Sequence, residues 1–167
     1  MSAVWNEGYF TDVGYTYGYY REINPVFQRF CLLVNGFAAP EPSPDDHHCE
    51  LGFGQGVSIN IHAAANPGHY VGTDFNPSHA AHAVALAEAS GSGARLYDDS
   101  FEQLLARNDL PRFDSISLHG IWTWVSRDNH KIIGAHASPV RFNNCRSNQA
   151  KPVDASAYQA CTFDKFV

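Results

Sequence analysis

Short apolar runs alternate with longer helical patterns through the middle of the chain. Four of these runs are predicted strands: 48–52, 70–74, 94–97 and 113–119. Three segments between them have helical spacing or a high alanine content and are predicted helices: 57–65, 77–89 and 100–106. Strands and helices that alternate at this spacing favour right-handed βαβ units. The pattern therefore predicts an α/β fold, a Rossmann-like parallel sheet with flanking helices.

A different pattern precedes the first predicted strand. Residues 9–20 are rich in Tyr and Gly and predict an ordered arm without regular secondary structure. Asn24-Pro25 predicts the start of a helix, because Asn caps helices well and Pro is tolerated at the first helical position. We therefore divide this part of the chain into an N-terminal arm and helix over 1–45 and a sheet-forming segment over 46–133.

The periodic pattern stops after Ile133. A helix capped by Ser126 is expected to end there, and residues 134–167 show neither strand nor helix spacing. We expect an irregular tail over 134–167 and a sheet that is incomplete after its fourth strand. An incomplete parallel sheet exposes one edge, so self-association through that open edge is expected.

Composition and charge exclude several classes of protein. The chain has 167 residues, of which 44% are hydrophobic and 13% aromatic, so it is not compositionally disordered. Its net charge of −6 without any cluster of Lys and Arg argues against a nucleic acid partner. The N-terminus lacks the features of a signal peptide, and no apolar run reaches the ~18 residues of a membrane span. The four cysteines lack zinc-ligand spacing. We expect a cytoplasmic protein with free thiols and no membrane partner.

A glycine-rich turn, Glu50-Leu-Gly52-Phe-Gly54-Gln-Gly56, joins the first predicted strand to its helix. Glycines there allow positive φ angles and close approach of a ligand to the backbone. The dinucleotide fingerprint would need a glycine at position 57, where Val57 stands, and Glu50 would repel a phosphate. The turn therefore favours a ligand with an ammonium or sulfonium charge over NAD. The alternative is a tight turn that binds nothing.

Acidic residues end the second and third predicted strands. Asp74 lies at the carboxyl edge of the sheet, where open α/β sheets bind ligands, and its carboxylate could accept both hydroxyls of a ribose. The alternative is a cap for the helix that follows. Of Asp98 and Asp99, one could accept from an adenine amino group, while the other would be a solvated cap.

Two histidines lie three positions apart on the alanine-rich predicted helix. His79 and His82 are expected on a solvated helix face. Metal binding would need Asp, Glu or Cys partners at ligand spacing, and the alanine-rich segment has none. No metal site is predicted.

These motifs, in this order, resemble the class I S-adenosylmethionine-dependent methyltransferases. The segments that carry the resemblance are Glu50–Gly56, Tyr70–Pro77, Asp98–Phe101 and Phe113–Gly120. More narrowly, Tyr15–Pro25 together with His119–Val125 is similar to a bacterial subgroup whose longer members carry a methyltransferase regulatory domain after the catalytic one. The resemblance covers residues 9–133.

The resemblance implies a cofactor and a role for each site residue. S-adenosylmethionine would be bound with its methionine end at Glu50 and at the three glycines of the turn. Asp74 would hold the ribose, and Asp99 or Asp98 the adenine edge. His119 would lie beside the sulfonium, either as a catalytic base or as a residue that shapes the pocket. Tyr17 and Tyr20 of the arm would fold over the cofactor.

The resemblance leaves the methyl acceptor open and implies an incomplete chain. Members of the family continue to a fifth strand and a closing hairpin, and no such pattern follows Ile133. We therefore expect a C-terminally truncated methyltransferase. The alternatives are a non-catalytic remnant that binds the cofactor weakly and a dinucleotide-binding oxidoreductase.

Overall fold

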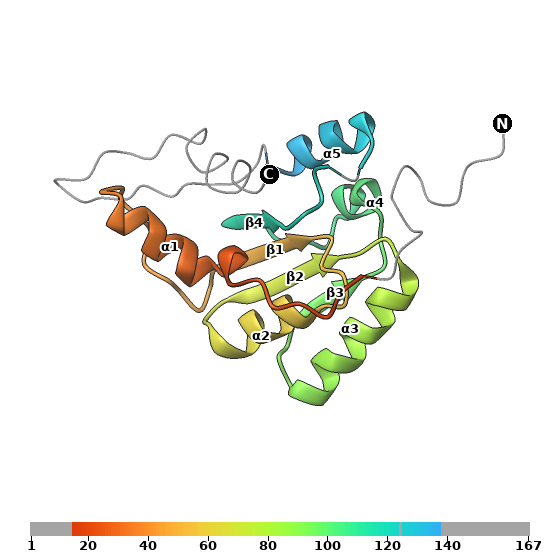
Figure 1. Ribbon diagram of the computed structural model, residues 1–167, viewed down its shortest axis with the longest axis horizontal. Coiled ribbons are helices and arrows are strands. Elements are labelled where there is room, and N and C mark those ends of the chain that lie inside the picture. The colour runs from red at the N-terminus through yellow and green to blue at the C-terminus, as the bar shows by residue number, and fades with distance from the viewer. Residues whose placement is uncertain (1–14, 124, 138–167) are drawn as a thin grey trace.

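A parallel sheet forms the centre of the computed structural model, which describes residues 15–123 and 125–137 (Figure 1). Within these residues the sheet has four strands in the order β3-β2-β1-β4. The strands are β1 (His47–Leu51), β2 (His69–Thr73), β3 (Arg95–Tyr97) and β4 (Ser115–Leu118). The helices are η1 (Arg21–Ile23), α1 (Pro25–Val34), α2 (Val57–Ala65), α3 (Pro77–Ser90), α4 (Phe101–Ala106) and α5 (Arg127–Ala137). The predicted α/β fold is confirmed.

The strand order reverses beside β1. The chain runs from β1 to β2 to β3 in one direction and then returns to place β4 on the other side of β1. Leu51 at the end of β1 pairs with Thr73 of β2 and with Leu118 of β4. The connections after β1 and β4 therefore leave the carboxyl edge in different directions, which is the arrangement at which open α/β sheets bind ligands.

Helices cover both faces of the sheet. Figure 1 shows α2 and α3 on one face and α4 and α5 on the other. Cys49, Leu51 and Val71 pack with Phe101 and Leu104 of α4 on one face. On the other face a separate core contains Phe53, Ile59, Tyr70, Ala80 and Ala83. Both faces of the central strands β1 and β2 are largely buried, as is usual in a parallel sheet.

Gly56 allows α3 to pack closely against the turn after β1. Its φ of +75° favours glycine, and a Cβ there would lie 2.3 Å from the Cβ and 3.0 Å from the Cα of Ala83. We expect Gly56→Ala to lower the free energy of unfolding by about 2–4 kcal/mol through overpacking and an unfavourable φ. Urea denaturation measures this loss.

Gly91 is the matched control, because it has a φ of +63° and nothing within 4 Å of the position of a Cβ. Gly91→Ala should cost only about 1 kcal/mol, the φ penalty alone. Equal losses for the two variants would contradict close packing at Gly56.

The helix starts follow from local capping. The Oδ1 atom of Asn24 accepts from the backbone N of Val26 at 2.9 Å, as predicted for the start of α1. Ser100 forms a capping box with Gln103 at the start of α4.

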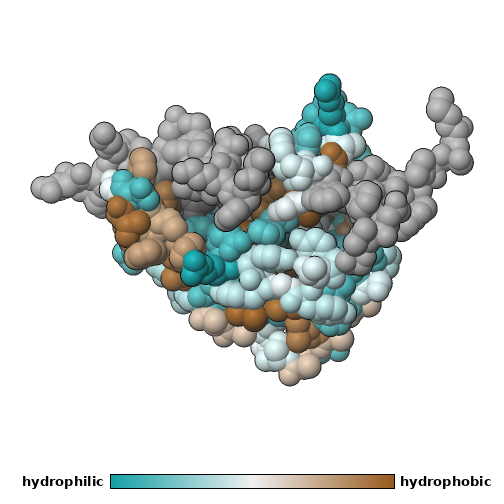
Figure 2. All heavy atoms as spheres, viewed as in Figure 1, coloured by the Kyte–Doolittle hydropathy of each residue, from teal (hydrophilic) through white to brown (hydrophobic). Residues whose placement is uncertain are grey.

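Much of the apolar surface of α1 is exposed: Phe30 is 58% and Val34 63% accessible. Figure 2 shows a hydrophobic patch over this helix.

The expected end of the last helix is wrong. α5 continues past Ile133 and Gly134 to Ala137. A Cβ on Gly134 would meet nothing within 4 Å, so this glycine lies on an open helix face. There it weakens the helix by about 1 kcal/mol without breaking it. The remainder of the predicted tail, 138–167, lies outside the described residues.

Each helix within residues 15–123 and 125–137 is too short or too polar to cross a membrane. Cys31 and Cys49 are free thiols. Burial is the main cause that raises the pKa of the Cys49 thiol. Cys145 and Cys161 lie outside the described residues.

Candidate functional site

The turn after β1 adopts a conformation that requires its three glycines. Gly52, Gly54 and Gly56 have φ angles of +72°, +58° and +75°. The backbone N of Gly52 donates to the carbonyl of Thr73 at 2.8 Å, so the turn begins directly against the end of β2. A Cβ on Gly52 would lie 2.4 Å from Cδ1 of Ile121. The turn is a backbone cradle between the ends of β2 and β4.

Asp74 joins this cradle to the end of β2. Its Oδ2 atom accepts from the backbone N of Gly54 at 2.8 Å. Its Oδ1 atom accepts from the backbone N of Asn76 at 3.0 Å and lies 3.1 Å from Nδ1 of His79. A carboxylate has about four acceptor positions, and the two backbone N–H groups occupy two of them, so two remain for His79 or a ligand. Asn76, not Asp74, caps α3, so the interpretation of Asp74 as the helix cap is wrong.

Glu50 is a buried acid beneath the cradle. It is 6% exposed and lies in β1 between Gly72 and Ser117 of the neighbouring strands. Burial, with a smaller contribution from the charge of Asp74, raises the pKa of Glu50 to about 8. The carboxyl group therefore keeps its proton at neutral pH. A positive charge bound nearby would favour the ionised form.

Asp98 and Asp99 have different surroundings. Oδ2 of Asp99 forms an ion pair with Nη1 of Arg107 at 2.8 Å, and the Asp99 carbonyl accepts from the hydroxyl of Thr73. Asp98 is exposed, and its carboxylate forms no ion pair in the part of the chain that the structure describes. Since Tyr97 pairs with Thr73, Asp98 and Asp74 follow two adjacent strand ends. Of the two acids, Asp98 has the carboxylate that is open to a ligand.

His119 lies directly after β4, across the reversal in strand order from the glycine turn. Its ring stacks on Tyr20, with ring centroids 3.9 Å apart and planes inclined by 19°. Its Nδ1 atom is 3.5 Å from Oε1 of Glu22. The N-terminal arm thus fixes the orientation of the imidazole and directs Nε2 away from Glu22.

The N-terminal arm also covers the cradle. A Cβ on Gly54 would lie 2.3 Å from Cδ1 of Tyr15, so this ring packs directly on the turn. Burial, and then the neighbouring Tyr20, raise the pKa of Tyr15. The backbone N of Tyr20 donates to the hydroxyl of Ser58 in α2 at 2.8 Å. Tyr17 is 70% exposed and lies edge-on to His82, with ring centroids 5.2 Å apart.

The expectation of a solvated face at His79 and His82 is wrong. His79 contacts Asp74, as described above, and Nδ1 of His82 lies 2.8 Å from the carbonyl of Gln55. His79 is the third residue of α3, a position from which a side chain reaches back past the cap. That position is the local signal that could have identified it. Tyr15 and Glu22 have no such signal, because they contact residues distant in sequence.

The predicted site residues gather where a ligand could bind, but the described residues do not form a metal centre. The cradle, Glu50, Asp74 and Asp98 lie along one edge of the sheet, as the sequence predicts, and His119 lies across the strand reversal from them. Among the described residues, no three His, Cys, Asp or Glu side chains converge where a metal ion could bind.

Likeness in fold comes from the comparison with solved structures. No family model matches the sequence. The chain is 40% identical over 131 residues to sll1526, an uncharacterized protein of Synechocystis sp., a match that covers 77% of this chain and 26% of that protein. PKMT2 from Rickettsia typhi in complex with AdoHcy matches with a TM-score of 0.63 and 19% identity, over 76% of this chain and 25% of that chain.

A second solved structure extends the comparison. A TehB-like SAM-dependent methyltransferase from Corynebacterium glutamicum matches with a TM-score of 0.51 and 17% identity, over 72% of this chain and 56% of that chain. The chain spans about a quarter of the length of sll1526 and of PKMT2. The order of strands, the glycine cradle after β1 and these likenesses together show that the described chain has the fold of the class I S-adenosylmethionine-dependent methyltransferases.

Proposed function

We propose that the chain binds S-adenosylmethionine at the carboxyl edge of its sheet and takes part in methyl transfer to an acceptor that is still to be identified. The observation that carries the proposal is the hydrogen bond from Gly54 N to Asp74 Oδ2 at 2.8 Å. It joins a backbone cradle to an acid suited to a ribose, above the buried acid Glu50. The AdoHcy in the PKMT2 complex supports the same class of ligand.

The residues present fit this cofactor. A Cβ at Gly52 would overlap Ile121 and a Cβ at Gly54 would overlap Tyr15, so the turn requires glycine at both positions. In the proposal, Glu50 and the glycine cradle hold the charged methionine end. Asp74 holds the ribose hydroxyls, and Asp98 accepts from the adenine amino group.

The bound cofactor supplies a methyl group on a good leaving group, so the protein's main task is alignment. His119 is suited to take a proton from an amine or hydroxyl acceptor. With Nδ1 facing Glu22 at 3.5 Å, the proton would be taken at Nε2. Tyr20 holds the ring in place by stacking on it.

Binding without transfer is the second candidate. Tyr20 covers one face of His119 at a centroid distance of 3.9 Å, which leaves the ring edge and the other face for the approach of an acceptor. A dinucleotide-binding oxidoreductase has less support. α2 begins at Val57, the position at which the dinucleotide fingerprint needs its third glycine.

Calorimetric titration of the full chain with S-adenosylmethionine, AdoHcy and NAD tests the proposed ligand class. We expect saturable binding of the first two and no heat from NAD. Binding of NAD with no response to AdoHcy would overturn the proposal in favour of the oxidoreductase.

Methyl transfer is tested with methyl-labelled S-adenosylmethionine and cell extract as the source of acceptors. We expect His119→Gln to slow label transfer by about 10²–10⁴-fold, the usual contribution of a general base. Its affinity for AdoHcy should stay within about 3-fold of wild type, because AdoHcy carries no methyl group to transfer and needs no base. His69→Gln, at an exposed position at the start of β2, is the control. Tight AdoHcy binding without any label transfer by the wild type would leave only the binding function.

A further inference from the structure

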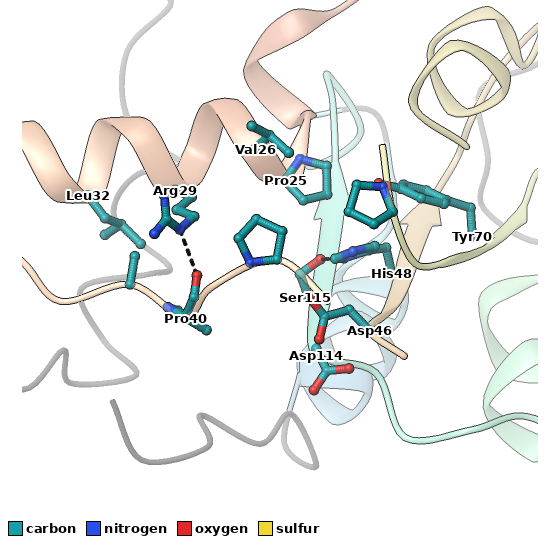
Figure 3. Close-up of a pocket in the computed structure, with 13 residues that line it drawn as sticks. Pro25, Val26, Arg29, Leu32, Pro40, Asp46, His48, Tyr70, Asp114 and Ser115 are labelled. Atoms are coloured by element: carbon teal, nitrogen blue, oxygen red, sulfur yellow. Dashed lines mark hydrogen bonds between the residues drawn. The ribbon is translucent and has the colours of Figure 1, made fainter. Parts of the chain in front are cut away.

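A cavity lies at the amino edge of the sheet, opposite the edge that carries the glycine cradle. It encloses about 110 Å³ between α1, the proline-rich connector and the starts of β1 and β4. Figure 3 shows Pro25, Val26 and Leu32 of α1 on one side of it. A polar group that includes His48, Asp46 and Asp114 lies on the other side. The walls thus combine an apolar side with an acidic one.

The two acids of the cavity retain acceptor atoms. Oδ2 of Asp46 accepts from the backbone N of Ser43 at 2.8 Å, and Oδ2 of Asp114 accepts from the backbone N of His47 at 2.9 Å. Neither carboxylate forms an ion pair with another described residue. Both side chains are half-buried, so water screens their charges less than at an open surface.

The other ionisable groups of the wall do not offset these charges. Arg29 pairs with Glu41 and donates from Nε to the carbonyl of Pro40 at 2.8 Å. Burial lowers the pKa of His48 and favours its neutral form. Its Nδ1 atom is 2.8 Å from the hydroxyl of Ser115. The cavity therefore carries two negative charges that no described group in its wall neutralises.

A buried hydroxyl points into the same cavity. Tyr70 is 5% exposed, and its oxygen has no hydrogen-bond partner of good geometry within the described residues. Figure 3 shows its hydroxyl end directed into the cavity, on the side nearer Pro25. Burial raises the pKa of Tyr70 to about 12, against a smaller lowering by the nearby Asn66 side chain, so the hydroxyl keeps its proton. A buried hydroxyl without a partner costs about 1–3 kcal/mol, which a ligand with a neutral polar group would recover.

We propose that this cavity binds a short amino alcohol, with its ammonium at Asp46 and Asp114, its hydroxyl at Tyr70 and its alkyl chain against Pro25, Val26 and Leu32. An ammonium has three donors and no acceptor, which suits two carboxylates. The second polar group is neutral, because a charge at the buried end would lose its hydration without a partner of opposite sign. A cavity of about 110 Å³ limits the ligand to a small molecule of a few heavy atoms.

The probe is 4-amino-1-butanol, with n-butylamine and 1,4-butanediol as compounds that lack the hydroxyl or the ammonium. Amide chemical shifts of the full chain report both binding and its position. We expect the amino alcohol to bind best, n-butylamine at least 5-fold more weakly and the diol weakest. Shift changes should centre on Tyr70 and Ser115 and leave Gly54 and Gly120 unchanged. Equal binding of the three compounds, or changes centred on Gly54, would overturn the proposal.

Variants of the cavity test the ammonium contact and the hydroxyl contact of the ligand separately. Asp114→Asn keeps an oxygen for the backbone N of His47 and should weaken both amines at least 10-fold. Asp46→Asn provides a second acid variant should the first fail to fold. Tyr70→Phe should weaken the binding of the amino alcohol alone, to the affinity of n-butylamine. It should also raise the melting temperature of the protein. Asp45→Asn, an exposed neighbour outside the cavity, is the control. If Asp45→Asn weakened amine binding as much as Asp114→Asn, the effect would come from general surface charge, and the proposed site would be refuted.

Discussion

The Asp74→Ala variant is expected to lose at least about 100-fold in affinity for AdoHcy. Hydrogen bonds to a charged group contribute about 1.5–3 kcal/mol each, and the proposed role gives this carboxylate two ribose hydroxyls. The variant also removes the acceptor for the backbone N of Gly54, which lies 2.8 Å from Oδ2 in the wild type. Calorimetric titration measures the loss, with Asp128→Ala on α5 as a control. Asp128 is an exposed acid that pairs with Lys131.

A second ligand separates the two roles of Asp74. The wild type should bind AdoHcy more tightly than its 2′-deoxy analogue, because the analogue lacks one of the two hydroxyls. If the carboxylate holds the ribose, Asp74→Ala should bind the two ligands equally. Asp74→Asn keeps an oxygen for Gly54 N–H and should preserve the turn while still losing affinity. Continued discrimination by Asp74→Ala would show that Asp74 only supports the cradle.

Replacement of Glu50 by glutamine is expected to stabilise the fold above pH 6.5 and to weaken binding of the cofactor. Folding raises the pKa of Glu50 from 4.5 to about 8. Between these values the unfolded chain has lost a proton that the folded chain keeps, so stability falls as pH rises. Glutamine has no proton to lose. At pH 8 the variant should be more stable by at least about 1.4 kcal/mol, the equivalent of one pKa unit.

The pH range for this measurement follows from a buried histidine. Burial lowers the pKa of His62 from 6.5 to about 4. Its contribution to stability is therefore lost as pH falls below 6.5, the opposite direction to Glu50. Urea denaturation between pH 6.5 and 8 isolates the Glu50 contribution, with Glu102→Gln at an exposed position of α4 as the control. A wild type whose stability does not fall over this range would contradict the raised pKa.

The Glu50→Gln variant also tests whether a negative charge at position 50 strengthens binding of the methionine end of the cofactor. Ionised Glu50 attracts the ammonium and sulfonium of S-adenosylmethionine, so wild-type affinity should rise with pH up to about 8. Glu50→Gln should bind at least about 10-fold more weakly at pH 8 and show no such dependence, since a hydrogen bond to a charged group is worth about 1.5–3 kcal/mol. Calorimetry in two buffers of different ionisation enthalpy should detect proton release only in the wild type. Equal proton release in both proteins would place the titrating group elsewhere.

The strands and helices were predictable because their signals are local. The start of α1 depends on one Asn-Pro pair, and the cap of α4 on Ser100 and Gln103. The error in the bounds of the helices, the extension of α5 past Gly134, arose because tertiary packing of Ile133 outweighs the low helix propensity of a single glycine. Propensity is a weak signal where packing acts on the same turn.

The candidate site was predictable in part. The cradle, Asp74 and the acids after β3 follow from the rule that ligands bind at the carboxyl edge of such a sheet. The sequence left Asp98 and Asp99 equal, because the choice depends on Arg107, which comes one helix later and binds Asp99. It left Tyr17 and Tyr20 unranked, whereas the fold places Tyr15 on the turn and leaves the Tyr17 side chain 70% exposed.

The sequence by itself determined the order of strands and helices, the glycine turn and the line of acids along one edge of the sheet. These features depend on φ preferences, caps and alternation, which are properties of neighbouring residues. Only the tertiary structure decided that Tyr15 packs on Gly54, that Glu22 faces His119 and that Tyr70 points into a cavity at the opposite edge. Each of these contacts joins separate segments of the chain, and no local pattern records which segments the fold brings together.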